Sequence, residues 1–364
     1  MSSTILPPSS PPLPFVVALR AVAALIIVWH HFALYPPLRD WAAPLVGELL
    51  GWFEHHARTT QVFFVVGGYV MARGMDARRW DGEQVRRFVL QRYLRLGLPY
   101  LGAIAVVLPA YLFARGWIPE AVLGSPVTWP QLLAHLFFLQ DILGYESLSA
   151  GLWFVCINLQ LSLIYITCLW LRDGTLARRI DFVGIAGWTL AALSLFHINL
   201  NPEWDRWSLY FFPYFFMGVV VHRALRTGGQ SREFWLYQLM LVAAMGYEWR
   251  WRLLIAVLVG LLLYGAERTG LGARWPRNRV VAWLGGISYS LFLIHFPALV
   301  LVGSLWAHLE WTTPEAAVAG LVTAFFLSLA AGDLFHRWIE QPAARLARRH
   351  TLLPPRSGKL QPAR

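Results

Sequence analysis

The chain has 364 residues, of which 57% are hydrophobic, 15% aromatic and only 14% charged, and its formal net charge is +11. A water-soluble domain devotes about a quarter of its residues to charged side chains, so this composition excludes an ordinary soluble globular protein. The basic residues cluster in alternate connections between apolar runs, which argues against nucleic acid as a partner.

Apolar runs long enough to cross a bilayer as helices recur along the chain. Long runs favour helices over a β-barrel, whose strands would read as short alternations. We therefore predict an all-α integral membrane protein with about ten transmembrane helices. The first run is expected to be a retained helix, because a cleavable signal peptide would place its charge before the apolar stretch. The predicted spans are residues 14–35, 60–73, 96–114, 152–171, 181–197, 208–222, 234–247, 252–266, 283–304 and 315–335.

The distribution of basic residues predicts the topology. With both termini in the cytoplasm and alternating spans, 24 of the 31 basic residues fall on the cytoplasmic side. The outer connections then hold six, and Arg20 lies within a span. Cytoplasmic loops carry such an excess of Lys and Arg, so the N- and C-termini are predicted to be cytoplasmic.

Several segments are not simple spans. Residues 77–95 are basic and partly apolar, which predicts an interfacial helix on the cytoplasmic leaflet. Residues 115–151 form the largest outer connection, which is expected to re-enter the membrane in part or to cap a cavity. Residues 1–13 are expected to be disordered, residues 14–345 to form the membrane domain, and residues 346–364 to form a basic cytoplasmic tail.

Arg20 and His31 stand out in the first predicted span. Eleven residues of helix turn through about 1100°, so both side chains project from one face, about 16 Å apart along the axis. Ionisable residues inside a membrane are costly and usually mark a functional site. The alternative is that Arg20 reaches the inner interface while His31 packs near the outer one. Histidine suits proton transfer because it titrates near neutral pH, and His30 lies beside it.

Arg92 and Arg95 lie one helical turn apart just before a span. Two guanidiniums at the cytoplasmic edge could grip phosphates bidentately. Anchoring to lipid headgroups is the other reading of the same pattern. Near the C-terminus, His295 could be structural or functional, and Glu340 is expected to pair with neighbouring arginines.

No metal site is expected. Cys156 and Cys168 lie in one apolar segment and are interpreted as small core residues. Residues 54–58 contain two histidines and a glutamate, but adjacent histidines point to different sides, so a solvated loop is the preferred interpretation.

Six short phrases follow one another along about residues 14–345: LRAVAALIIVWHHF, VFFVVGGYVMARG, QRYLRLGLPY, YFFMGVVVHRAL, ISYSLFLIHFP and RWIEQP. In this order they resemble phrases of the acyltransferase-3 family of integral membrane acyltransferases. The family's first helix has an arginine, ten intervening residues and a histidine, as Arg20 and His31 do here. The third phrase resembles the family's R-x-x-R-x-x-P element.

The resemblance implies an enzyme of a bacterial inner membrane that takes an acyl group, with acetyl favoured, from cytosolic acyl-CoA. The acceptor it implies is a hydroxyl of an envelope glycan or glycolipid. Carried onto this sequence, His31 and Arg20 become the catalytic candidates, and Arg92 and Arg95 the donor-binding ones. The substrate-binding candidates are His30, Asp141, Trp153, Asn158, Tyr289 and His295.

Two departures from the family pattern are visible. Gly67 stands where the family usually has serine, and Asn158 stands at the position of the family's glutamate. No catalytic carboxylate is therefore assigned at Asn158, which joins Ser288 and Tyr289 as candidate donors to the reaction's oxyanion.

The resulting hypothesis is direct transfer in a ternary complex, with His31 as general base on the acceptor hydroxyl. A covalent acyl-histidine intermediate is the alternative. Two other classes stay open at this point: a transporter or flippase without acyl chemistry, and a scaffold in polysaccharide export. Acidic residues are scarce in the spans and lie only near their ends, which speaks against a cation-coupled relay.

Overall fold

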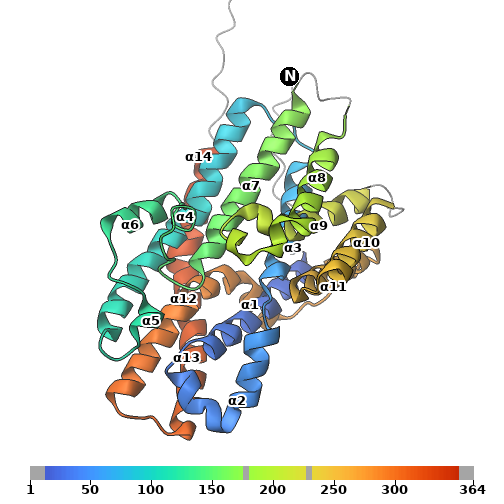
Figure 1. The fold of residues 1–364 in the computed structure, drawn as a ribbon. Coiled ribbons are helices and arrows are strands. Elements are labelled where there is room, and N and C mark those ends of the chain that lie inside the picture. Colours follow the sequence, from blue (N-terminus) through green and yellow to red (C-terminus); the bar gives the residue numbers. More distant parts are fainter. Residues whose placement is uncertain (1–12, 175–179, 227–231, 352–364) are drawn as a thin grey trace, which may run out of the picture.

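A computed structural model describes residues 13–174, 180–226 and 232–351. Within these ranges the chain is helical, without strands, apart from one isolated bridge between Arg115 and Ile118 (Figure 1). The α-helices are α1 (Pro14–Leu34), α2 (Leu38–His56), α3 (Thr60–Met75), α4 (Gly82–Ala114), α5 (Glu120–Leu123), α6 (Trp129–Leu136), α7 (Leu152–Asp173), α8 (Phe182–Phe196), α9 (Ser208–Arg226), α10 (Arg232–Tyr247), α11 (Trp251–Arg268), α12 (Arg279–His308), α13 (Pro314–Phe335) and α14 (Gln341–Thr351). Short helical turns complete the chain: η1 (Ile198–Leu200), η2 (Pro202–Trp204), η3 (Leu271–Ala273) and the π-helical η4 (His336–Glu340).

Each of the ten predicted spans falls on a helix. Among the described residues, seven helical segments are long and apolar enough to cross a membrane. These are α1, α4, α7, α8 with η1, α9, α12, and α13 with the helical segments that follow it. The helices α3 and α10 have only 16 residues each, and α11 carries three charged residues. The all-helical class is confirmed, whereas the count of ten and the cytoplasmic termini stay predictions.

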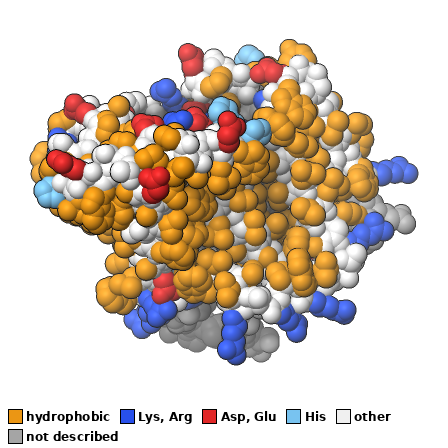
Figure 2. Space-filling model, turned by 90° about the horizontal axis from the view of Figure 1, so that it is seen from below, with side chains coloured by type: hydrophobic (Ala, Val, Ile, Leu, Met, Phe, Trp, Pro, Cys, Tyr) orange, Lys and Arg blue, Asp and Glu red, His pale blue; other side chains and the backbone are white. Residues whose placement is uncertain are grey.

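The exposed surface suits a membrane. Figure 2 shows hydrophobic side chains covering the middle of one face, with mostly basic side chains along one edge and acidic and histidine side chains along the other. Tryptophan favours the interface between lipid and water, and the exposed tryptophans lie in connections, in terminal turns of helices or in η4. They are Trp52, Trp117, Trp129, Trp170, Trp204, Trp207, Trp235, Trp249, Trp251, Trp275, Trp283, Trp311 and Trp338.

Two segments differ from the sequence interpretation. The helix α2, which is kinked at Val46, occupies a region assigned only to an outer loop. The basic segment 77–95 is not a separate interfacial helix, because α4 continues unbroken from Gly82 through Pro99 to Ala114. A capping box at Asp81 and Gln84 starts this helix, whose basic half leads directly into the apolar half.

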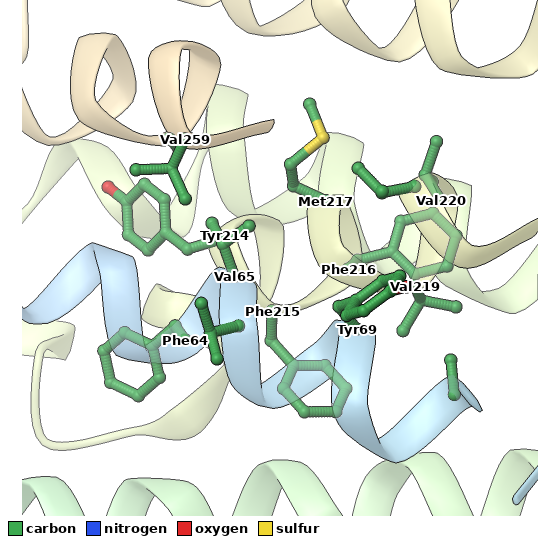
Figure 3. Packing of buried hydrophobic residues seen from close by; sticks show 14 of the residues in the cluster. Phe64, Val65, Tyr69, Tyr214, Phe215, Phe216, Met217, Val219, Val220 and Val259 are labelled. Atoms are coloured by element: carbon green, nitrogen blue, oxygen red, sulfur yellow. The ribbon is translucent and has the colours of Figure 1, made fainter. Parts of the chain in front are cut away.

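The packing of α3 against α9 shows how tightly the bundle is closed (Figure 3). A methyl group at Gly68 would overlap the carbonyl oxygen of Phe215, and one at Gly218 would overlap the carbonyl oxygen of Val65. Small residues let helix backbones approach closely in membrane proteins. Two of the sequence phrases noted above, in α3 and α9, are thus packing partners.

The helix α12 is buried over most of its length and lies along both α1 and α13. A methyl group at Gly285 would overlap the backbone of Val17, so α12 and α1 are in close contact at this level. This contact brings the ionisable residues of α1 against the polar residues of α12.

The predictions for the two ends of the chain lie almost entirely outside the described residues. The predicted disorder at residues 1–13 falls outside the described residues except for Leu13, and so does the tail beyond Thr351. The division into a membrane domain and a basic tail stays a prediction.

Candidate active site

His31 of α1 and His295 of α12 form a hydrogen-bonded pair. Their Nδ1 and Nε2 atoms lie 2.6 Å apart, and the rings are 4.8 Å apart and nearly parallel, at 8°. His295 Nδ1 lies 3.1 Å from the carbonyl oxygen of Leu291. The sequence interpretation had placed His295 among the substrate-binding candidates, whereas the structure makes it the partner of His31.

The partners fix the tautomers of this pair. A carbonyl oxygen only accepts hydrogen bonds, so Nδ1 of His295 carries the proton and donates to Leu291. In the neutral imidazole the other ring nitrogen is then an acceptor, so Nε2 of His295 accepts from Nδ1 of His31. Nε2 of His31 is left with its lone pair, which is the arrangement that a general base requires.

Two cavities meet at His31 and Trp153. One, which we call the histidine cavity, has a volume of about 350 Å³ and is also lined by His30 and Asp141. The other, the loop cavity, has about 610 Å³ and is lined largely by residues 120–125 and 146–150. The connection 115–151 therefore covers a cavity at His31, as one of its two predicted roles requires.

Asp141 lies in this connection, outside the membrane-spanning helices. It accepts hydrogen bonds from Gln140 and Ser147. Burial raises the pKa of its carboxyl group above the ordinary value, and the nearby Asp205 carboxylate adds to this rise.

The predicted arginines gather in a separate place, the arginine cavity, of about 210 Å³. Arg20 donates to Ser288 Oγ at 2.9 Å. Arg92 donates to Asn158 Oδ1 at 2.6 Å and to Ser162 Oγ at 3.0 Å. The cavity is lined by Arg20, Arg92, Arg95, Asn158, Ser288, Tyr289 and Glu340, together with apolar residues.

The arginine cavity adjoins a fourth, the basic cavity, of about 450 Å³. The two share Val70, Met71, Arg92 and Arg95 in their walls. Three further arginines line the basic cavity: Arg78, Arg79 and Arg87. Arg95 has no hydrogen-bond or ion-pair partner in the described part of the chain, so its guanidinium is available to a ligand at the junction.

Three phenylalanines form a cluster in the wall of the arginine cavity, and one of them contacts the histidine pair. Phe63, Phe154 and Phe292 all line the arginine cavity, and their ring centroids are 5.1–6.1 Å apart. The ring of Phe292 also lies 6.1 Å from that of His295. Through Phe292 this aromatic cluster links the wall of the arginine cavity to the histidine pair.

The remaining candidates have other surroundings. Asn158, Ser288 and Tyr289 line the arginine cavity but neither cavity at His31, so the structure does not bring these oxyanion candidates to the histidine. Tyr289 donates to the carbonyl oxygen of Leu96. Glu340 pairs with His336 and accepts from Ser290, not from the arginines expected as its partners.

The structure also adds residues that sequence reasoning missed. Arg58, Asp205, Arg206 and Arg252 line the histidine cavity. For the three arginines a signal is present in the sequence, because they belong to connections that the predicted topology places outside, where arginine is scarce. No group of three or more His, Cys, Asp or Glu side chains suited to a metal ion occurs among the described residues.

Comparison with known proteins identifies the family of the chain. The family model of the acyltransferase-3 family, described as an acyltransferase domain, matches residues 13–333. No curated protein and no solved structure gives a significant match. The chain belongs to the acyltransferase-3 family and is a membrane-embedded acyltransferase.

Proposed function

We propose that this enzyme moves an acyl group, with acetyl favoured, from cytosolic acyl-CoA to a hydroxyl of an envelope glycan or glycolipid in a bacterial inner membrane. The observation that carries the proposal is the chain of hydrogen bonds from His31 through His295 to Leu291, which leaves a lone pair on His31 Nε2. A base with this tautomer can take a proton from an acceptor hydroxyl.

The donor end of the proposal rests on charge. Coenzyme A carries several phosphate charges at one end and its thioester at the other, and guanidiniums bind phosphates well. Arg78, Arg79 and Arg87 line the basic cavity, and Arg95 stands free where it meets the arginine cavity. The thin arm of the donor would then extend past Arg20 and the aromatic cluster toward His31.

The charge at Arg92 also supports the binding of an anionic donor such as acyl-CoA. In this chain Asn158 accepts from Arg92 where the family usually has glutamate. A neutral amide leaves the positive charge of Arg92 uncompensated. The arginine cavity thus holds three guanidiniums and one carboxylate, Glu340, which favours an anionic ligand beside it.

The proposed reaction is a direct transfer. The acceptor hydroxyl gives its proton to His31 Nε2 while its oxygen bonds to the thioester carbonyl carbon. The carbon–sulfur bond then breaks, the ester remains on the acceptor, and the departing thiolate takes the proton from the imidazolium. His295 holds His31 in the required tautomer throughout, and it accepts a stronger hydrogen bond when His31 is charged.

Transfer of radiolabel tests the proposed function. The purified protein in nanodiscs is incubated with acetyl-CoA labelled in the acetyl group and with an extract of bacterial envelope glycolipids and glycans. We expect label to enter the extract as an ester that hydroxylamine releases. The proposal is contradicted if the folded protein transfers no label from acetyl-CoA, and none from labelled succinyl-CoA or longer acyl-CoA donors.

Substitution of Arg95 tests the donor site. Arg95→Gln is expected to raise the KM for acyl-CoA by about tenfold or more with a small change in kcat, because a hydrogen bond to a charged group contributes about 1.5–3 kcal/mol. Steady-state kinetics with varied acyl-CoA measures the effect. Arg86→Gln is the matched control, since Arg86 is an exposed residue of the same helix that is paired with Glu83. Equal KM values for the two variants would remove Arg95 from the donor site.

A further inference from the structure

Three arginines from separate parts of the chain converge on the histidine cavity. Arg58 lies between α2 and α3, Arg206 precedes α9, and Arg252 lies in the first turn of α11. Arg58 and Arg206 make no hydrogen bond or ion pair with any described residue. Arg252 is held in place by Tyr210: it donates to the hydroxyl at 3.0 Å and lies over the ring at 5.6 Å.

This convergence is unusual because arginine is scarce at this end of the bundle. By helix order, six arginines belong to the connections on the side that holds His31. Arg39 is paired with Glu54, and Arg250 is bonded to Asn199. Arg115 stands outside the histidine cavity. Half of the guanidiniums on this side therefore line one cavity, where Arg58 and Arg206 make no hydrogen bond or ion pair within the described part of the chain.

The cavity also contains groups that suit a sugar. Asp141 and Asp205 can accept hydrogen bonds from hydroxyl groups, and Trp153 offers an apolar surface between the two cavities at His31. The three guanidiniums outnumber the two carboxylates, so the wall carries a net positive charge. A neutral glycan would offer no anionic group to the guanidiniums of Arg58 and Arg206.

We infer that the histidine cavity binds an anionic saccharide, whose carboxylate or phosphate group is held by Arg58, Arg206 and Arg252 while one of its hydroxyls faces His31. The inference rests on the proposed function, because it assigns the acceptor of that same reaction. Arginine forks match both kinds of anionic group bidentately. The charge thus selects the acceptor class and orients the hydroxyl that reacts.

The test measures binding without an acyl donor, so its result does not depend on whether acyl transfer occurs. Two pairs of probes are titrated onto the protein in nanodiscs of zwitterionic lipid. Trigalacturonate is compared with maltotriose for the carboxylate, and glucose 6-phosphate with glucose for the phosphate. We expect the anionic member of at least one pair to bind about tenfold more tightly or better, and the pair that shows this preference identifies the group.

Two variants complete the experiment. The double variant Arg58→Gln with Arg206→Gln is expected to reduce the preference by about tenfold, whereas Arg115→Gln, a control arginine on the same side, is expected to keep it. Absence of a preference in the unaltered protein overturns the inference. Persistence of the preference in the double variant overturns it too, since the anion would then bind elsewhere, and so does an equal loss in Arg115→Gln.

Discussion

His31→Gln is expected to lower kcat for acyl transfer by about 10²-fold or more while leaving the KM for acyl-CoA nearly unchanged. General base catalysis contributes about 10²–10⁴-fold to a rate, and a glutamine amide cannot take the proton of the acceptor hydroxyl. The donor phosphates are expected to bind at Arg95, in a different cavity, so donor affinity has no reason to fall.

The measurement is label transfer from acyl-CoA at saturating acceptor, together with titration of the donor. His55→Gln is the matched control, because His55 lies exposed on α2 with Nδ1 bonded to the carbonyl oxygen of Gly51. His30→Gln is the sharper comparison. His30 lines the same cavity, and its Nδ1 donates to the Phe53 carbonyl, which leaves its Nε2 as a second candidate base. Full activity in His31→Gln with a large loss in His30→Gln would transfer the base role to His30.

The first helix was predictable in most of its details. Helix periodicity predicts Arg20 and His31 on one face, about 16 Å apart along the axis. In the structure Arg20 lines the arginine cavity and His31 lines the histidine cavity, as this separation requires, although the sequence analysis had grouped them as catalytic candidates. A regular helix of 21 residues has few alternatives, so the sequence alone determines these relations.

The contact between His31 and His295 was not predictable in the same way. The two residues are 264 positions apart, and only the packing of α12 along α1 brings them together. Helical phase says which face a residue occupies but not which helix covers that face. For the same reason, sequence alone does not show that Asn158 and Ser162 of α7 accept hydrogen bonds from Arg92 of α4.

Hydropathy missed one helix and misplaced the start of another for a physical reason. It reports the medium around a segment, whereas helix ends are set by capping and by backbone-breaking residues. The polar helix α2 contains Asp40, Pro44 and Glu48 and so reads as a loop. Nothing breaks the backbone between Arg92 and Leu96, so α4 continues as one helix even though its surroundings change.

The hydrogen bonds around His295 lead to the last prediction, that a leucine there is far more harmful than a glutamine. His295→Leu removes the acceptor for Nδ1–H of His31, so the tautomer with a free Nε2 lone pair is no longer held. We expect kcat to fall by about 10–10²-fold, the range set by one lost hydrogen bond to a group that becomes charged. The KM for acyl-CoA should stay close to its original value.

His295→Gln separates this positioning role from simple packing. Its side-chain oxygen can still accept from His31, so it should recover at least about half of the decrease in log kcat seen in the leucine variant. Thermal unfolding of both variants shows whether the fold survives, and kcat with saturating donor and acceptor shows the effect on chemistry. If leucine and glutamine reduce kcat equally in folded protein, His295 matters through its volume in the core. If only leucine does so, the lone pair of His31 depends on the hydrogen bond that α12 supplies.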